Sequence, residues 1–372
     1  MVERGSCILS TGGTGGHVFP TIALAESLVE KGWRVIIFSD IRGKSFLDKS
    51  KNYYQVETVS ISSGSIPFLR KLWIYQFQIP LSIIRTLRIL LKDKPQFVVG
   101  FGGVSTIPVL VASLILRVPI FLQEQNAVLG KVNRIFQRFS NIVFHHFDTT
   151  KFLDEHKSVA SGNPVRRIIL EKENCQYLSP GPWPNTILVL GGSQGASLLS
   201  ALIPQALSRL TKKTKERLTV FHQARKEDLD KVVRSYDEVH VKAHVAPFFE
   251  NVEQLISEAQ LIICRAGANT LTDISSIGRP AISIPLATAK DNHQRNNAKI
   301  FENNKAAVVI EENEISPKKL SVAISKILKS PSKASLMAER SYSISKTNAS
   351  EKIISEIERK IGKYVDSNQT SS

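Results

Sequence analysis

The sequence has few of the residues that build disulfide frameworks or zinc sites. Its three cysteines, Cys7, Cys175 and Cys264, are odd in number and lack the paired spacing of metal ligands. Two of them lie within apolar, strand-like runs, which favours reduced structural thiols in the cytosol. The first residues lack the apolar core of a signal peptide, so we expect no export. No short-period repeat is visible, which excludes solenoids and propellers.

Long apolar runs are also scarce, with one exception. Residues 97–116 carry no charged side chain over a length that could span a membrane. The stretch GFGGVSTIP within this run would break a spanning helix midway. We therefore predict a buried strand, a glycine loop and a buried helix here.

Acidic residues are under-represented. The chain has 33 Asp and Glu against 49 Lys and Arg, a formal net charge of +16. Such an excess favours an acidic partner, which could be nucleic acid, anionic lipid or a phosphorylated substrate. Because no RNA-binding aromatic motif and no helix-turn-helix pattern occurs, we expect no nucleic-acid partner.

Apolar strand candidates alternate with helical patterns along the whole chain, which predicts an α/β fold with parallel sheets. The strand candidates are residues 7–11, 33–38, 96–100 and 118–122, then 186–190, 218–222, 238–242, 260–264, 281–285 and 306–310. We expect two Rossmann-like, doubly wound domains facing a cleft. They cover residues 1–163 and 164–345, and a terminal helix over 346–364 packs back on the first domain. A disordered tail over 365–372 follows.

Glycine loops follow strand candidates at three places. CILSTGGTGGHVFP covers residues 7–20, TILVLGGSQGA covers 186–196, and GFGG covers 100–103. Glycine lets a backbone turn tightly beside a ligand, and the following helix start offers N–H groups to an anion. Val18 breaks the dinucleotide fingerprint in the first loop, and neither of the two long loops has the Gly-Lys-Ser/Thr of a Walker A motif. Two phosphate-handling domains are therefore predicted.

His17 directly follows the first loop and is the candidate general base. At a helix N-terminus its imidazole would be held neutral and able to accept a proton, although a capping or packing role is equally compatible with its position. Asp228 and Asp230 form a D-x-D pattern, but they lie in a charged amphipathic helix pattern, which favours a solvated face. We predict no metal and no other cofactor.

Six motifs resemble, in the same order, those of a known family. They are GGTGGHVFP (12–20), QEQNAVLG (123–130), GNPVR (162–166), GGSQGA (191–196), CRAGANTLTDI (264–274) and DNHQRNNA (291–298). The chain resembles the MurG family, the N-acetylglucosaminyltransferases of peptidoglycan synthesis. The resemblance implies a GT-B glycosyltransferase that moves GlcNAc from UDP-GlcNAc, with inversion, to the MurNAc 4-hydroxyl of undecaprenyl-pyrophosphoryl-MurNAc-pentapeptide. It also implies peripheral attachment to the cytoplasmic face of the bacterial inner membrane.

The resemblance assigns substrate contacts in the first half of the chain. Thr14, Gly15 and Gly16 would contact the donor sugar or the acceptor pyrophosphate through backbone N–H groups. Asn126 would hold the GlcNAc, and Arg166 would bind the donor.

It assigns further donor contacts in the second half. Ser193 would lie near the diphosphate, Phe249 would face uracil, and Gln294 would contact the sugar. The segment from Ala268 to Asp273 would open the helix under the ribose. Asp273 departs from the glutamate of many members, and Gln123 departs from their histidine, which makes position 123 a poor place for the base. The third loop reads GGVST where an aromatic residue often follows the glycines.

Two other interpretations remain open from the sequence. One is another GT-B enzyme that uses UDP-GlcNAc, such as a 2-epimerase. The other is a non-enzymatic basic protein of membrane surfaces. Residues 66–94 combine aromatic, basic and apolar side chains, including Arg70, Lys71, Arg85 and Arg88, and favour an anionic membrane surface as a partner.

Overall fold

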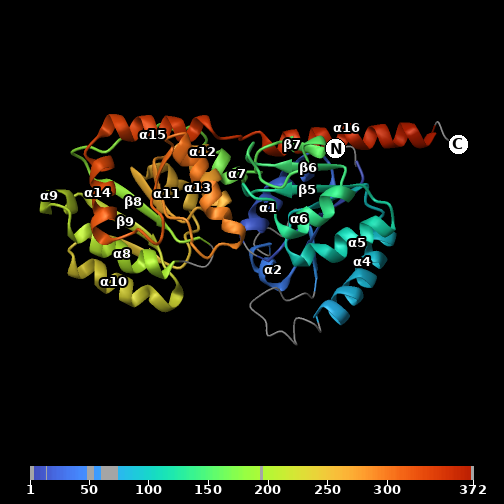
Figure 1. The fold of residues 1–372 in the computed structure, drawn as a ribbon, viewed down its shortest axis with the longest axis horizontal. Coiled ribbons are helices and arrows are strands. Elements are labelled where there is room, and N and C mark those ends of the chain that lie inside the picture. Colours follow the sequence, from blue (N-terminus) through green and yellow to red (C-terminus); the bar gives the residue numbers. More distant parts are fainter. Residues whose placement is uncertain (1–3, 14, 48–53, 60–73, 193–195, 370–372) are drawn as a thin grey trace. The chain divides into compact units, whose positions relative to one another are not determined.

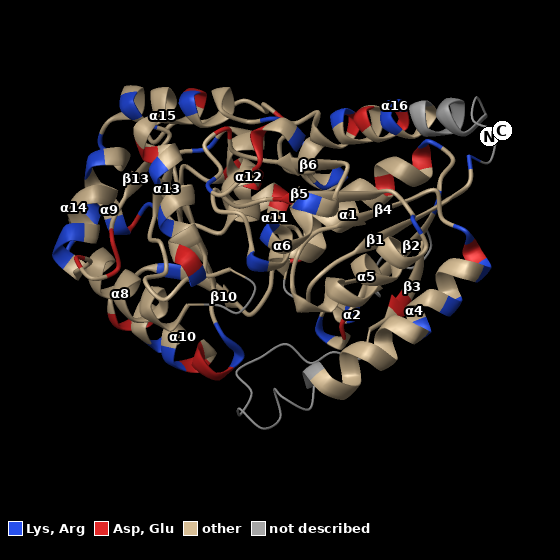
Figure 2. Cartoon of the chain, turned by 45° about the vertical axis from the view of Figure 1, so that its right-hand side comes forward, with Lys and Arg blue, Asp and Glu red and all other residues tan. Residues whose placement is uncertain are grey.

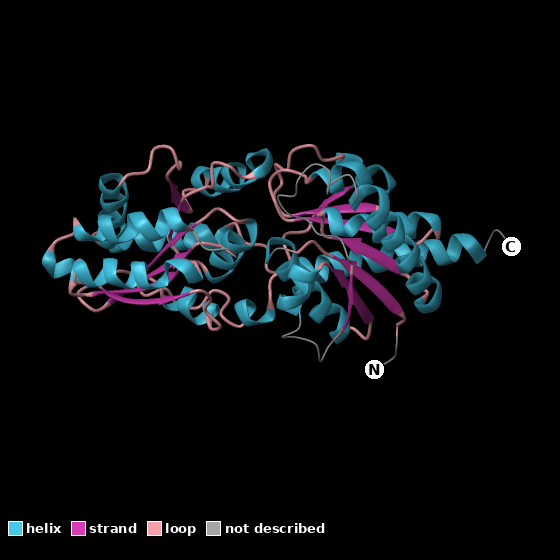
Figure 3. Ribbon diagram, turned by 90° about the horizontal axis from the view of Figure 1, so that it is seen from below, coloured by secondary structure: helices cyan, strands magenta, loops and turns pink. Residues whose placement is uncertain are grey.

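The computed structural model describes residues 4–13, 15–47, 54–59, 74–192 and 196–369. The chain divides into two compact units (Figure 1). Unit 1 comprises Met1–Arg167 and Lys346–Ser372, and unit 2 comprises Ile168–Ser345. Each unit contains one parallel β-sheet with helices on both faces (Figure 3). The prediction of two doubly wound α/β domains is thus confirmed.

The sheet of unit 1 has seven described strands in the order β3-β2-β1-β4-β5-β6-β7. Their bounds are β1 Ser6–Ser10, β2 Arg34–Ser39, β3 Gln55–Thr58, β4 Phe97–Gly100, β5 Ile120–Glu124, β6 Ile142–His145 and β7 Ser158–Ala160. All neighbouring pairs are parallel. The central strands are buried on both faces, which explains why the sequence shows them as continuous apolar runs.

Successive residues of these strands contribute to two different cores. Cys7 and Leu9 pack on the face that α1 and α16 cover, whereas Ile8 packs on the face that α4, α5 and α6 cover. The helices are α1 Gly15–Glu30, α2 Ile41–Leu47, α4 Ile79–Asp93, α5 Ile107–Ile115, α6 Lys131–Phe136 and α16 Ala349–Gln369, with short helical turns η2 Ile74–Gln78, η3 Val104–Thr106, η4 Gln137–Phe139 and η5 Glu155–Lys157. Alternation of side chains across a strand therefore builds both layers of the unit.

Helix α16 returns to unit 1 from the far end of the sequence. Ile353, Ile354 and Ile357 are buried in the core that α1 shares. The indole Nε1 of Trp33 donates to Glu358 Oε1 at 3.2 Å. The helix thus completes one face of the first sheet.

The sheet of unit 2 has six described strands in the order β10-β9-β8-β11-β12-β13. Their bounds are β8 Asn185–Leu190, β9 Leu218–Gln223, β10 Lys242–Ala246, β11 Leu261–Cys264, β12 Ala281–Ser283 and β13 Ala307–Val309. The helices are α7 Arg167–Leu170 at the junction of the units, then α8 Ser197–Ser208, α9 Lys212–Lys215, α10 Leu229–Glu238, α11 Val252–Glu258, α12 Ala268–Ile277, α13 His293–Asn303, α14 Pro317–Leu328 and α15 Pro331–Ser343, with turns η6 Lys226–Asp228 and η7 Lys290–Asn292.

One predicted strand lies at a different place in the structure. The sequence places a strand at residues 238–242, but α10 extends to Glu238 and β10 begins at Lys242. His240 adopts a φ of 56° in the turn between them. The charge-free run at residues 97–116 is, as predicted, a strand, a glycine loop and a helix. Among the residues searched, no helix is long and apolar enough to cross a bilayer.

Candidate active site

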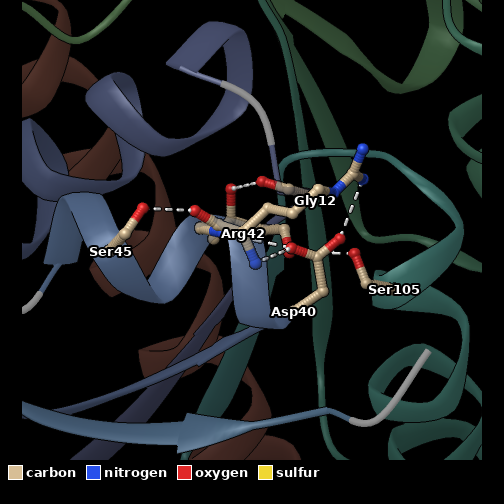
Figure 4. Close-up of polar contacts among 7 residues, drawn as sticks. Gly12, Asp40, Arg42, Ser45 and Ser105 are labelled. Carbon is tan, nitrogen blue, oxygen red and sulfur yellow. Dashed lines mark hydrogen bonds and ion pairs between the residues drawn. The ribbon is translucent and has the colours of Figure 1, made fainter. Parts of the chain in front are cut away.

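The first and third glycine loops meet at the carboxyl edge of the unit 1 sheet. β1 lies between β2 and β4, so the chain turns to opposite sides after β1 and after β4. Such a switch point is where open α/β sheets bind ligands. The loops touch so closely that a β-carbon on Gly103 would lie 3.0 Å from the Gly12 Cα. Ser105 Oγ also donates to the Thr11 carbonyl at 3.1 Å (Figure 4).

His17 occupies this edge, in the first turn of α1. Its half-buried ring lies beside the backbones of both loops, because β-carbons on Gly12 and Gly102 would be 3.1 Å from its Cδ2 and 3.4 Å from its Cε1. The side-chain amide of Gln125 contacts the ring from a third side, with 2.5 Å between Gln125 Nε2 and His17 Nδ1. The fold therefore brings the candidate base together with a residue 108 positions away.

Glu124 organises the loop that carries Gln125. Its buried carboxylate accepts four hydrogen bonds, from Asn126 N, Asn126 Nδ2, Gly130 N and Asn133 Nδ2, at 2.8–3.1 Å. Burial raises the pKa of this carboxyl, and the four donors oppose that effect. Because each oxygen is already held by loop donors, Glu124 is placed to shape the loop rather than to accept a substrate proton.

Other candidate residues of unit 1 lie around this edge. Gly15 and Gly16 are the first residues of α1, and Thr14 lies outside the described residues. Asn126 is half-buried, and Glu124 fixes the plane of its amide. Arg166 lies in unit 1, with its guanidinium carbon 4.5 Å from the ring centroid of Phe19 on α1.

An ion pair between a buried carboxylate and an exposed arginine supports the first glycine loop from the β2 side. Asp40 follows β2, and its carboxylate accepts from Arg42 N and Gly43 N at 3.1 Å and from Arg42 Nη2 at 3.0 Å (Figure 4). The same carboxylate fills the space beside Gly13. The sequence analysis did not identify Asp40, although an acidic residue directly after a buried strand is a usable signal.

Unit 2 presents a second glycine loop after β8. Gly192 there has a φ of 83°, a conformation that favours glycine, and α8 begins at Ser197. The candidate Ser193 lies outside the described residues. The adjacent strand β11 is followed by Gly267, the N-cap of α12. Ala268 is the first residue of this helix, and Asp273 lies half-buried about one turn further on.

The remaining donor candidates are Phe249, in the loop after β10, and Gln294, in the first turn of α13. Phe249 is half-buried and packs edge-on against Phe221, with 6.1 Å between the ring centroids. Gln294 Oε1 accepts from Leu286 N at 3.0 Å, so its amide holds the loop after β12. The sequence analysis missed a pair beside it, Arg265 and Glu312, whose ends lie 2.8 Å apart with Arg265 almost fully buried.

The D-x-D pattern lies at the start of α10, away from the glycine loops in the sequence, and its first aspartate is engaged in local hydrogen bonds. Asp228 lies at the start of α10, where Arg225 Nε and Ser197 Oγ donate to it at 2.9 and 3.0 Å. These contacts hold its pKa below the usual range. In the part of the chain that the structure describes, no group of three or more His, Cys, Asp or Glu side chains could hold a metal ion.

Comparison with known proteins identifies both units. Residues 7–145 match the glycosyltransferase family 28 N-terminal domain, and residues 186–357 match the C-terminal domain of that family. A protein of Agrobacterium fabrum named UDP-N-acetylglucosamine–N-acetylmuramyl-(pentapeptide) pyrophosphoryl-undecaprenol N-acetylglucosamine transferase is 37% identical, covering 94% of this chain and 93% of its own. A protein of the same name from Phenylobacterium zucineum is 34% identical over 96% and 98% of the two chains.

Solved structures agree with the sequence relatives. The crystal structure of Acinetobacter baumannii MurG aligns with a TM-score of 0.75 at 27% identity and covers 95% of this chain and 99% of its own. A putative UDP-N-acetylglucosamine 2-epimerase from Listeria monocytogenes aligns with a TM-score of 0.69 at 12% identity, a likeness of fold alone.

Proposed function

The chain belongs to the MurG family within glycosyltransferase family 28, and from this premise we propose how its residues carry out the transfer. The enzyme moves GlcNAc from UDP-GlcNAc to the 4-hydroxyl of MurNAc in undecaprenyl-pyrophosphoryl-MurNAc-pentapeptide. The hydroxyl oxygen attacks the anomeric carbon, the bond to the diphosphate oxygen breaks with its electrons leaving on UDP, and the hydroxyl proton passes to a base.

We assign that base to His17. The observation that carries this assignment is the convergence of two glycine loops and Gln125 on its ring at the switch point of the first sheet. Backbone N–H groups at Gly15 and Gly16 open α1 beside it and suit an anionic pyrophosphate. Glu124 is unsuited to the role because its carboxylate is occupied by the loop it holds.

We assign the UDP moiety to the carboxyl edge of the unit 2 sheet. The start of α12 at Ala268, with Asp273 in the same helix, supports binding of the ribose hydroxyls. The diphosphate would accept hydrogen bonds from N–H groups of the loop that contains Ser193, and Phe249 would face the uracil. Gln294 and Asn126 would contact the sugar, and Arg166 would neutralise the leaving group. Main-chain dipoles and cations then stabilise the departing UDP.

We further propose peripheral attachment to the anionic cytoplasmic face of the inner membrane through α4. Leu81, Ile84 and Leu91 on this helix are 69%, 48% and 60% exposed. The exposed Arg85 and Arg88 lie on the same helix, and Figure 2 shows basic residues along it in blue. Arg70 and Lys71 lie outside the described residues. Apolar and basic side chains on one helix suit an anionic headgroup region.

A transfer assay tests the function directly. Purified protein, radiolabelled UDP-GlcNAc and the lipid-linked acceptor should give a labelled lipid-linked disaccharide. His17→Ala should lower kcat by about 10²- to 10⁴-fold and leave UDP affinity unchanged, whereas the exposed His156→Ala should behave as the wild type. An epimerase would convert UDP-GlcNAc without acceptor, and a surface-binding protein would not retain it. Undiminished turnover in His17→Ala would remove His17 from the mechanism.

A further inference from the structure

Gln125 makes an unusual contact for a deeply buried amide. It is 1% exposed, and its Nε2 lies 2.5 Å from His17 Nδ1. Its Oε1 is buried and has no hydrogen-bond partner within the described part of the chain. Buried amide oxygens normally have a partner. The amide nitrogen of Gln125 therefore contacts His17, while the amide oxygen makes no hydrogen bond to the described residues.

The residues around Gln125 and His17 hold the two side chains in contact. Gln125 directly follows β5, and the residues after it are tied to the carboxylate of Glu124 through Asn126 and Gly130. The ring of His17 is confined by the backbones of Gly12 and Gly102. Neither side chain can leave the contact without disturbing a glycine loop or the Glu124 network.

The orientation of the amide decides which ring nitrogen is basic. A neutral histidine carries one proton, so a donor at Nδ1 places that proton on Nε2, and Nε2 then cannot accept another. An acceptor at Nδ1 places the proton on Nδ1 and leaves the Nε2 lone pair available. A half-turn of the Gln125 amide exchanges its nitrogen for its oxygen at the same site. That half-turn breaks no hydrogen bond of Oε1 and gives it a donor.

We propose that Gln125 is a positioning residue that holds His17 as the Nδ1–H tautomer, with Gln125 Oε1 accepting from Nδ1–H and Nε2 directed to the acceptor hydroxyl. The inference rests on the proposed role of His17. Gln125 acts through the ring and does not touch the reacting atoms. The arrangement parallels the general rule that the hydrogen bond at one histidine nitrogen sets the function of the other.

Nitrogen-15 NMR of imidazole-labelled protein tests the proposal without turnover. The His17 signals, identified by their loss in His17→Ala, should show the Nδ1–H tautomer in the wild type. Gln125→Met, which keeps the shape but cannot hydrogen-bond, should shift His17 towards the Nε2–H form. Gln123→Met is the matched control, since Gln123 is a buried glutamine two positions earlier on β5 whose Nε2 donates to the Gly162 carbonyl. An Nε2–H tautomer in the wild type, or a tautomer unaffected by Gln125→Met, would overturn the proposal.

Kinetics separate this inference from the assignment of the base. Gln125→Met should lower kcat by about 100-fold with UDP affinity unchanged, and should have no further effect when combined with His17→Ala. Gln125→Glu, which presents only acceptors, should retain far more activity than Gln125→Met. If His17→Ala is fully active, the base is misassigned, yet the NMR result still decides whether Gln125 sets the tautomer. If the double variant loses as much kcat as the two single losses multiplied together, Gln125 does not act through His17.

Discussion

The carboxylate of Asp40 occupies the space that a β-carbon on Gly13 would need. Two backbone N–H groups and the Arg42 guanidinium hold this carboxylate, so it cannot move aside without losing hydrogen bonds. The first glycine loop therefore has its shape dictated by a side chain from the end of β2 as well as by its own conformation.

Gly13→Ala should consequently destabilise unit 1. Overpacking against a fixed neighbour costs about 1–3 kcal/mol, and we expect hydrogen exchange of the β1 and β2 amides to rise accordingly. Gly362→Ala is the matched control, because nothing lies within 4 Å of its added β-carbon in α16. That change should stabilise the helix by about 0.5–1 kcal/mol. Equal protection in Gly13→Ala and the wild type would contradict the packing described for Asp40.

Asp273→Ala should weaken UDP binding without unfolding unit 2. A lost hydrogen bond between a carboxylate and a ribose hydroxyl corresponds to roughly 1.5–3 kcal/mol, or about 10- to 160-fold in Kd. Isothermal titration calorimetry with UDP measures this change. Asp237→Ala, an exposed aspartate on α10 of the same unit, should leave Kd as in the wild type. Unchanged affinity in Asp273→Ala would place the ribose elsewhere.

Reversing the charge of Arg85 and Arg88 should release the protein from anionic vesicles. Each basic residue near such a surface contributes about 1 kcal/mol, so loss of two weakens binding by about 30-fold even before repulsion is counted. Co-sedimentation with phosphatidylglycerol vesicles at rising salt concentration measures the strength of this binding. The control replaces Lys212 and Lys213, exposed on α9 of unit 2, with glutamate. If both double variants sediment alike, α4 is not the attachment surface.

Acid should destabilise unit 2 through His222. This buried imidazole contacts Tyr236 Oη at 2.7 Å and Ser200 Oγ at 3.3 Å, and burial lowers its pKa to about 4. An unfolded histidine takes up a proton below about pH 6.5, whereas folded His222 stays neutral until about pH 4, so protons favour the unfolded state between these values. The stability is fully present above pH 6.5 and declines by about 3 kcal/mol as pH falls to 4.

Hydrogen exchange of the β9 amides at pH 7 and pH 5, corrected for intrinsic rates, measures the part of that loss reached by pH 5, about 2 kcal/mol. His222→Gln should flatten the pH dependence, because glutamine does not titrate. His240→Gln, at an exposed position of the same unit, should keep it. A pH dependence as steep in His222→Gln as in the wild type would assign the effect to another group.

The sequence predicted the fully buried strands at the centre of each sheet well, and it missed three strands of the first sheet. β1, β4, β8 and β11 are buried on both faces, so each is a local apolar run that needs no knowledge of its neighbours. The edge strand β3 is short, polar and partly exposed, and carries no such pattern, so the sequence missed it. β6 and β7 were also missed, although β6 is apolar and buried.

By itself, therefore, the sequence determined the fold class, the two doubly wound domains and the family. Buried strands and glycine loops are recognised from short stretches of sequence, and the six motifs in their fixed order can be recognised in a single sequence. Only the tertiary structure decided that Gln125 meets His17 and that Asp40 fills the space beside Gly13. These contacts join residues whose sequence separation carries no signal, because strand order and register set which loops share a sheet edge.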